Sequence, residues 1–199
     1  MNRPVRRVRP IRSVVEQRAR YRDYKPDLRN DFSESCGYCD APDWMFGGTR
    51  GFQIDHFAPQ NLFPALELIY SNLVYSCSYC NRAKWHKWIG NDPSTPNDGT
   101  QGFIDPCDLE YEVHLERAPE GEIVALSPLG EYIVRELKLN LIRHKFIGQV
   151  HKLNELKRRI RVVVDNLPDD ADSVDIRSLL EEYTSLDSQI EQYIRTIQA

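Results

Sequence analysis

The stretch Cys36-Gly-Tyr-Cys39, followed after 37 residues by Cys77-Ser-Tyr-Cys80-Asn81-Arg82-Ala83-Lys84, decides the fold of this 199-residue chain. Each Cys-x-x-Cys pair delivers two thiolates from one tight turn, so the two pairs can close one tetrahedral zinc site. Four ordinary buried cysteines are the alternative, but two such doublets favour metal where the thiols stay reduced. We therefore expect four ligands of a structural zinc ion: Cys36, Cys39, Cys77 and Cys80.

Between the two cysteine pairs lies Ile54-Asp55-His56, where a carboxylate and an imidazole adjoin at the predicted end of a strand. A neutral imidazole can take a proton from water near neutral pH, so His56 is the candidate general base, although a lone histidine is more often structural. Asp55 and Asn81 offer oxygen ligands that suit Mg²⁺ or Mn²⁺, while Asn81 has an alternative role as a helix cap. The pattern favours metal-dependent hydrolysis of phosphodiesters.

Three further polar residues accompany this candidate site. Asn72 precedes a predicted strand, and we expect it to hydrogen-bond across the loop before it and to fix the backbone behind His56. Lys84 lies one helical turn beyond Asn81 and is placed to meet a phosphate, and Arg82 is a weaker candidate for the same contact.

Other conspicuous side chains have simpler interpretations. Trp85 and Trp88 follow Asn81 by four and seven positions, a spacing that predicts packing rather than base stacking. Cys107 is interpreted as a small buried thiol, not as a metal ligand. His114 can belong to the site, but a histidine in a hairpin strand is more often structural.

Positive charge gathers at the start of the chain. Residues 1–30 hold ten Arg or Lys and three Asp or Glu, whereas the whole chain has a net charge of −4. A basic arm on an acidic body is expected where one segment contacts phosphates, and a solvated tail is the alternative. Beside a candidate phosphodiesterase site we favour phosphate contact. The candidate contacts in the arm are Arg3, Arg6, Arg7 and Arg9.

The chain divides into a basic arm (1–30), a central module (31–105) and a hairpin with a helical region (106–199). In the arm, residues 1–12 are expected to be extended and mobile and residues 13–24 to form a short basic helix. The central module is expected to hold two strands and a helix, at 52–57, 69–76 and 78–89. The third part is expected to hold a hairpin around 119–121 and helices from 128 to about 166 and from 174 to 197.

The composition, 41% hydrophobic and 28% charged, is typical of a soluble globular protein. No apolar run reaches the roughly 18 residues of a membrane span, and no secretory signal is visible. We therefore expect a cytoplasmic protein with no membrane partner. The oligomeric state stays open.

Taken in order, the pattern Cys-x-x-Cys, Asp-His, Asn-Leu, Cys-x-x-Cys-Asn-x-x-Lys over roughly residues 36–90 resembles the HNH endonucleases of the ββα-metal fold. The resemblance implies an α+β fold with a ββα module that a four-cysteine zinc site stabilises. A basic arm precedes this module, and a mostly helical extension follows it. It implies a general base, two ligands of a catalytic Mg²⁺ or Mn²⁺ and a loop-fixing residue: His56, Asp55 with Asn81, and Asn72. The third signature position is Asn81 rather than His, a variation that the family tolerates.

The C-terminal half is similar to small bacterial HNH proteins encoded in phage-defence operons, including the nuclease subunit of Septu systems, which works with an ATPase. This similarity rests on Phe103-Ile-Asp-Pro106, His114-Leu115 and Leu137-Lys-Leu-Asn140. It implies a DNA endonuclease that acts in an anti-phage complex with an operon-encoded ATPase. Because no recognition helix or multi-finger array is evident in the sequence, we expect low sequence specificity. The alternative is a non-catalytic, zinc-stabilised subunit that binds nucleic acid or protein. RNA as the natural target stays open.

Overall fold

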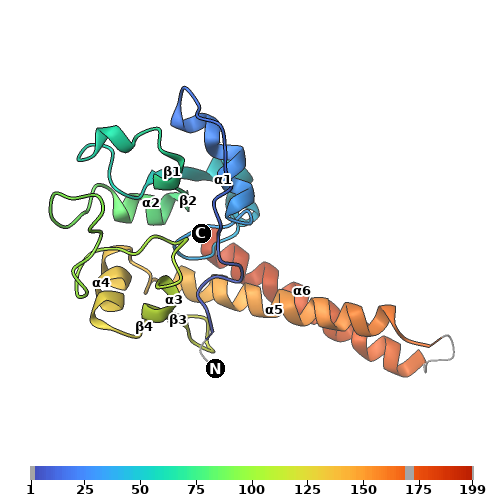
Figure 1. Ribbon diagram of the computed structural model, residues 1–199. Coiled ribbons are helices and arrows are strands. Elements are labelled where there is room, and N and C mark those ends of the chain that lie inside the picture. The colour runs from blue at the N-terminus through green and yellow to red at the C-terminus, as the bar shows by residue number, and fades with distance from the viewer. Residues whose placement is uncertain (1–2, 169–172, 199) are drawn as a thin grey trace.

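The structure is a computed structural model that describes residues 3–168 and 173–198, and its fold is α+β. Its central module is an antiparallel strand pair followed by a helix (Figure 1): β1 (Phe52–His56), β2 (Leu73–Cys77) and α2 (Ser78–Lys84). The register sets Asp55 opposite Val74 and His56 opposite Leu73. The predicted ββα arrangement is confirmed.

The boundaries of this module differ from the predicted ones. β2 begins at Leu73 rather than at Ile69, because Tyr70–Asn72 form a turn of 3₁₀ helix first. α2 ends at Lys84 rather than near Ile89, because Trp85 has a φ of 49°, which a continuing right-handed helix excludes.

Short helices surround the module. α1 (Lys25–Asp31) has Pro26 in its first turn, where a missing backbone N–H breaks no helical hydrogen bond. Helices of the 3₁₀ type span Tyr21–Tyr24, Asp43–Phe46, Gly48–Gly51, Pro64–Leu66 and Tyr70–Asn72.

The helix predicted for residues 13–24 does not form over its first part. Val14 is fully exposed, so a helix here would bury little apolar surface. Side-chain contacts hold the segment extended instead: Ser13 donates twice to Asp31, and the Arg18 N–H donates to the Tyr24 hydroxyl at 2.9 Å. Helical structure therefore begins only at Tyr21.

Residues 3–20 form an extended segment, here called the strap, that crosses the body from the lower hairpin to α1 (Figure 1). Val5 is buried, and its N–H donates to Glu112 at 2.7 Å. The Arg3 carbonyl accepts from the Arg117 N–H at 2.9 Å. The predicted extended conformation is present, but the predicted mobility of residues 3–12 is contradicted by these contacts.

The lower part of the body in Figure 1 holds a second two-stranded sheet. β3 (Leu115–Arg117) pairs with β4 (Ile123–Ala125), which confirms the hairpin expected around 119–121, and the helical turn α3 (Tyr111–His114) directly precedes β3. α4 (Pro128–Glu136) begins as the Ser-Pro pair predicts, with the Ser127 hydroxyl accepting from the Gly130 N–H at 3.1 Å.

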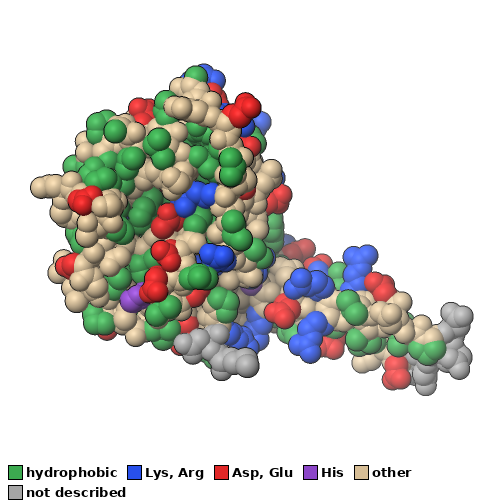
Figure 2. All heavy atoms as spheres, viewed as in Figure 1, with side chains coloured by type: hydrophobic (Ala, Val, Ile, Leu, Met, Phe, Trp, Pro, Cys, Tyr) green, Lys and Arg blue, Asp and Glu red, His purple; other side chains and the backbone are tan. Residues whose placement is uncertain are grey.

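Two long helices, α5 (Ile142–Asp165) and α6 (Ser173–Gln198), pack against each other in a hairpin that projects from the body (Figure 1). Their shared face includes buried Ile160, Leu186 and Ile190. In the space-filling view, Lys, Arg, Asp and Glu lie close together along the projecting part (Figure 2). Within residues 3–168 and 173–198, no helix combines the length and apolarity needed to cross a membrane.

Candidate functional site

The two Cys-x-x-Cys pairs are here called the first knuckle (Cys36 and Cys39) and the second knuckle (Cys77 and Cys80). Their four side chains lie close together. Their sulfur atoms all lie within 4.8 Å of one another, and all four residues are buried. Tetrahedral Zn–S bonds of about 2.3 Å require sulfur atoms roughly 3.8 Å apart, and the Sγ atoms of Cys39 and Cys77 are 3.9 Å apart. Burial raises the pKa of the Cys39 thiol, so a cation is needed to hold four thiolates here. The donor set and its spacing fit a structural zinc ion.

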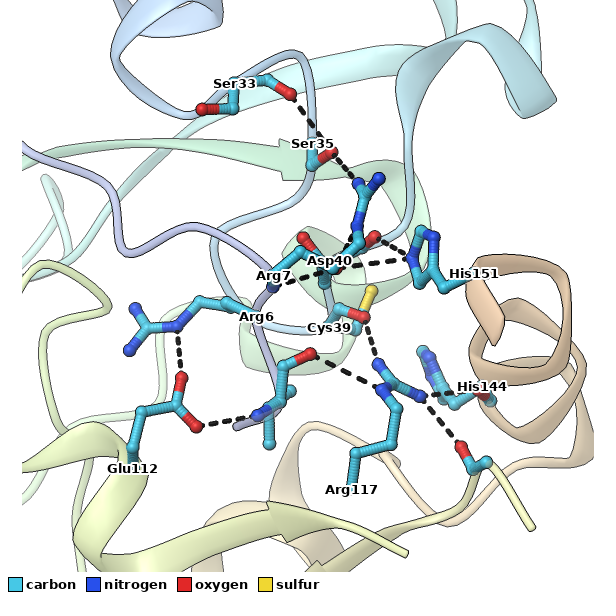
Figure 3. A network of polar contacts seen from close by, with 12 residues as sticks. Arg6, Arg7, Ser33, Ser35, Cys39, Asp40, Glu112, Arg117, His144 and His151 are labelled. Carbon is cyan, nitrogen blue, oxygen red and sulfur yellow. Dashed lines mark hydrogen bonds and ion pairs between the residues drawn. The ribbon is translucent and has the colours of Figure 1, made fainter. Parts of the chain in front are cut away.

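The first cysteine knuckle is held by residues that lie far from it in the sequence and belong to neither Cys-x-x-Cys motif. Arg117 donates to the Cys39 carbonyl at 2.9 Å, and its Nη1 donates to the carbonyls of Gly121 and His144 (Figure 3). His151 Nε2 lies 2.8 Å from the Asp40 carbonyl. The hairpin β3–β4 and helix α5 therefore both anchor the knuckle.

Two more buried groups of α5 lie beside this region. Arg143 stacks its guanidinium on the Tyr79 ring, with the guanidinium carbon 3.5 Å from the ring centroid. Within the described residues, the side-chain nitrogens of Arg143 and His144 are buried without hydrogen-bond partners. Burial lowers the pKa of His144 to about 4, while Cys77 acts in the opposite direction. A zinc tetrathiolate has a formal charge of −2, and the Arg143 guanidinium adds positive charge next to the second knuckle.

Asp55 lies at the β1–α2 interface and is only 5% exposed. Its Oδ2 accepts from the Tyr38 hydroxyl at 2.5 Å and lies 3.5 Å from the Lys84 ammonium. Lys84 also donates to the His56 carbonyl at 3.1 Å. Burial raises the pKa of Asp55, and the Lys84 cation opposes that rise most strongly. The carboxylate is thus held within a small polar cluster of the interior.

Asn81 lies on α2 and contacts β1 through its side chain. Its Nδ2 donates to Gln53 Oε1. Gln53 and Asp55 lie on one face of β1 because side chains alternate along a strand, and Asn81 and Lys84 lie one turn apart on α2. Asp55 and Asn81 therefore lie on two elements that contact each other, β1 and α2, and each side chain has its own partner. Among the described residues, no hydrogen bond reaches Asp55 Oδ1 or Asn81 Oδ1, so two hard oxygen donors suited to Mg²⁺ or Mn²⁺ are available.

His56 is the adjacent strand residue, and it is 9% exposed. Its Nε2 lies 3.1 Å from the Glu67 carbonyl, which can only accept, so Nε2 carries the proton. In the neutral ring Nδ1 then keeps its lone pair, and no described residue bonds to it. Tyr21 packs edge-on against the imidazole, with 4.8 Å between ring centroids. The Glu67 carbonyl and the Tyr21 ring thus fix the orientation of the imidazole.

Asn72 closes the loop between β1 and β2. Its Oδ1 accepts from the Ala58 N–H at 2.8 Å, and its Nδ2 donates to the Ala58 carbonyl at 3.0 Å. The Asn72 carbonyl accepts from the Phe57 N–H at 2.8 Å. These bonds fix the backbone that directly follows His56.

The basic residues expected to contact nucleic acid are mostly engaged elsewhere. Lys84 is fully buried, and Arg6 is buried against Glu112 at 2.8 Å, so both act as internal counter-charges rather than as surface contacts. Arg7 pairs with Asp40 at 2.7 Å (Figure 3).

Three of these basic residues remain at the surface. Arg9 is exposed and donates to the Cys107 carbonyl at 3.2 Å. Arg3 and Arg82 are exposed and form no ion pair with any described residue. The two other open candidates are half-buried: Cys107, and His114, whose Nδ1 contacts the Ser127 hydroxyl at 2.5 Å.

Comparison with known proteins gives one match. Residues 36–87 match the family model described as HNH endonuclease. No curated protein and no solved structure matches the chain.

Proposed function

We propose, on the premise that residues 36–87 are a domain of the HNH endonuclease family, that this protein is a divalent-metal endonuclease that hydrolyses DNA. The observation that carries the proposal is the orientation of His56. The Glu67 carbonyl keeps the proton on Nε2, so Nδ1 is free to accept a proton from water. Asn72 supports this geometry by fixing the following loop.

In the proposed reaction His56 Nδ1 takes a proton from a water that attacks the scissile phosphorus. Asp55 and Asn81 would hold the catalytic Mg²⁺ or Mn²⁺, which supplies stabilisation of negative charge on the phosphate and the leaving oxygen. A zinc ion held by the four cysteines would fix the start of α2, the helix that carries Asn81.

The proposed DNA contacts carry little sequence information. Arg82 is an exposed cation one residue from Asn81, has no ion pair with the residues that the structure describes, and is suited to a phosphate. Arg3, Arg7 and Arg9 of the strap are exposed as well, although Arg7 already pairs with Asp40. We therefore propose low sequence specificity.

A nicking assay tests the proposal. Zinc-loaded protein is incubated with supercoiled plasmid in Mg²⁺ or Mn²⁺ and, separately, in EDTA; single-stranded DNA and RNA are tested in parallel. We expect cleavage only with the divalent ion and at least a hundredfold loss in His56→Ala. His86→Ala, which removes an exposed imidazole near α2, is the matched control and should cut as wild type does. Equal cutting by His56→Ala and wild type would refute the assignment.

A second candidate function is a non-catalytic subunit that binds nucleic acid or protein. The pairing of Asp55 with Lys84 and the low exposure of His56 favour it, because a buried ion pair and a largely buried imidazole can serve to stabilise the fold alone. The projecting α5–α6 hairpin offers a long surface for a partner (Figure 1). An operon-encoded ATPase in an anti-phage complex is the partner we propose, and co-purification of the two co-expressed proteins tests it.

A further inference from the structure

Trp85 does not pack as its spacing predicts. Its side chain is 63% exposed, whereas Trp88 packs edge-on against Phe57 and Phe63, with ring centroids 5.4 and 5.7 Å apart. A large indole left in water forgoes the burial that normally stabilises such a side chain. The interior of the protein thus gives no reason for a tryptophan at this position.

The backbone of Trp85 also disfavours this residue type. Its φ and ψ are 49° and −130°, and the Lys87 N–H donates to the Lys84 carbonyl at 3.0 Å. These are the features of a type II′ turn with Trp85 at the first central position, which glycine usually occupies because side chains clash there. A strained backbone that presents an exposed aromatic ring indicates a role outside the folding of the chain itself.

Trp85 lies next to the candidate site. The Trp85 N–H donates to the Asn81 carbonyl at 2.8 Å, so the indole starts one helical turn beyond the proposed ion ligand. The exposed, unpaired Arg82 lies on the same short helix. From Ser78 to Asn91 the sequence holds no acidic side chain. Lys84 is buried and Lys87 pairs with Glu136 at 2.8 Å, so Arg82 is the cation of this stretch that is left for a ligand among the described residues. The surface is therefore suited to a polyanion with aromatic groups.

We propose that the Trp85 indole stacks on a base of the nucleic-acid strand next to the scissile phosphate, while Arg82 binds a neighbouring phosphate. This inference rests on the proposed function, because the candidate site is what brings the strand to α2. Every base has an aromatic face, so stacking adds affinity without sequence preference. A loss of about tenfold or more in affinity is expected when such a ring is removed.

Binding is measured without hydrolysis, in the His56→Ala background of the full zinc-loaded chain. The probe is a fluorescein-labelled, mixed-sequence single-stranded DNA oligonucleotide, followed by anisotropy, and tryptophan fluorescence is recorded with unlabelled DNA. Trp85→Ala should weaken binding at least tenfold and remove most of the quenching, and Trp85→Phe should retain most of the affinity. Trp44→Ala is the matched control, because Trp44 is 53% exposed on a different helix, and it should bind normally.

Trp85→Gly separates function from folding. Glycine relieves the turn, so this variant should show a higher thermal midpoint and yet bind as weakly as Trp85→Ala. Normal binding by a folded Trp85→Gly or Trp85→Ala variant overturns the inference, even if wild type cuts DNA. A protein that cuts nothing but loses affinity on Trp85→Ala would refute the proposed hydrolysis and keep the stacking contact.

Discussion

Lys84 is an ammonium group with no exposure to water, and its charge is balanced by one carboxylate. It contacts Asp55 at 3.5 Å and the His56 carbonyl at 3.1 Å. Burial alone disfavours the charged form and lowers the pKa of Lys84, while the attraction of Asp55 opposes this. Each charge therefore depends on the other to remain in the interior.

This dependence predicts a strong non-additivity. Lys84→Met should destabilise the fold by about 3–5 kcal/mol, because it leaves the Asp55 carboxylate buried without a cation. The double variant Asp55→Asn with Lys84→Met should recover much of that loss. Urea unfolding of the zinc-loaded single and double variants measures both values, and strictly additive losses would contradict the pairing.

Residue spacing indicated which side chains share a helix face, but not which face turns inward. Lys84 and Arg82 were both assigned to phosphate from the sequence, and only the packing of α2 on β1 buries Lys84 and exposes Arg82. The Asn72 contacts across the loop follow directly from its place before β2. The role of the Glu67 carbonyl had no sequence signal, because any residue type supplies a carbonyl.

At the scale of elements, helix α5 is joined to the first zinc knuckle through His151. Its Nε2 lies 2.8 Å from the Asp40 carbonyl and 3.3 Å from the Asp40 carboxylate, with Arg7 and Arg117 also close. Burial is the main cause that lowers the pKa of His151 to about 4. The imidazole is therefore neutral in the folded protein at neutral pH.

The depressed pKa makes stability depend on pH. Unfolded chains protonate this histidine near its ordinary pKa, so the stabilisation is complete above pH 6.5 and is lost as pH falls towards 4, by up to about 3 kcal/mol. His151→Gln should show a shallower fall in unfolding free energy between pH 7 and 5 than wild type. His86→Gln, at an exposed position, should follow wild type. Parallel curves for wild type and His151→Gln would refute the role of His151.

The apolar periodicity of the long helices predicted α5 and α6 well, because a continuous stripe must be buried against another helix. The segment 13–20 was misassigned, since local propensity did not reveal that Ser13 and Arg18 bond to distant side chains. Tertiary contacts of this kind override a weak helical tendency.

At the scale of the whole molecule, the basic arm and the acidic body neutralise each other through internal pairs. Arg6, Arg7 and Arg12 of the strap pair with Glu112, Asp40 and Asp105 at 2.7–2.9 Å. The sequence correctly indicates an excess of positive charge in the arm, but several of these arginines pair with carboxylates of the protein itself rather than with a ligand. Composition gives the charge of a segment, but it does not show which acidic side chains lie next to that segment in the folded protein.

Zinc removal should affect the whole body, because the strap, the hairpin β3–β4 and helix α5 all meet at the first knuckle (Figure 3). Treatment with 1,10-phenanthroline is expected to abolish the cooperative thermal transition and the near-ultraviolet circular dichroism. Added Zn²⁺ should restore both, whereas Mg²⁺ should not. An unchanged thermal midpoint in the metal-free protein would show that the four cysteines have no structural role.

The contacts that anchor the strap also determine when the strap can fold during synthesis of the chain. Val5 bonds to Glu112 and Arg117, which follow it by 107 and 112 positions. A ribosome that has just finished residue 100 has therefore made the entire HNH segment and neither of these anchors. Contacts so distant along the chain close slowly, because a long loop loses entropy before any bond is gained. Refolding from denaturant should accordingly show a late phase in which the strap docks, well after the helices have formed.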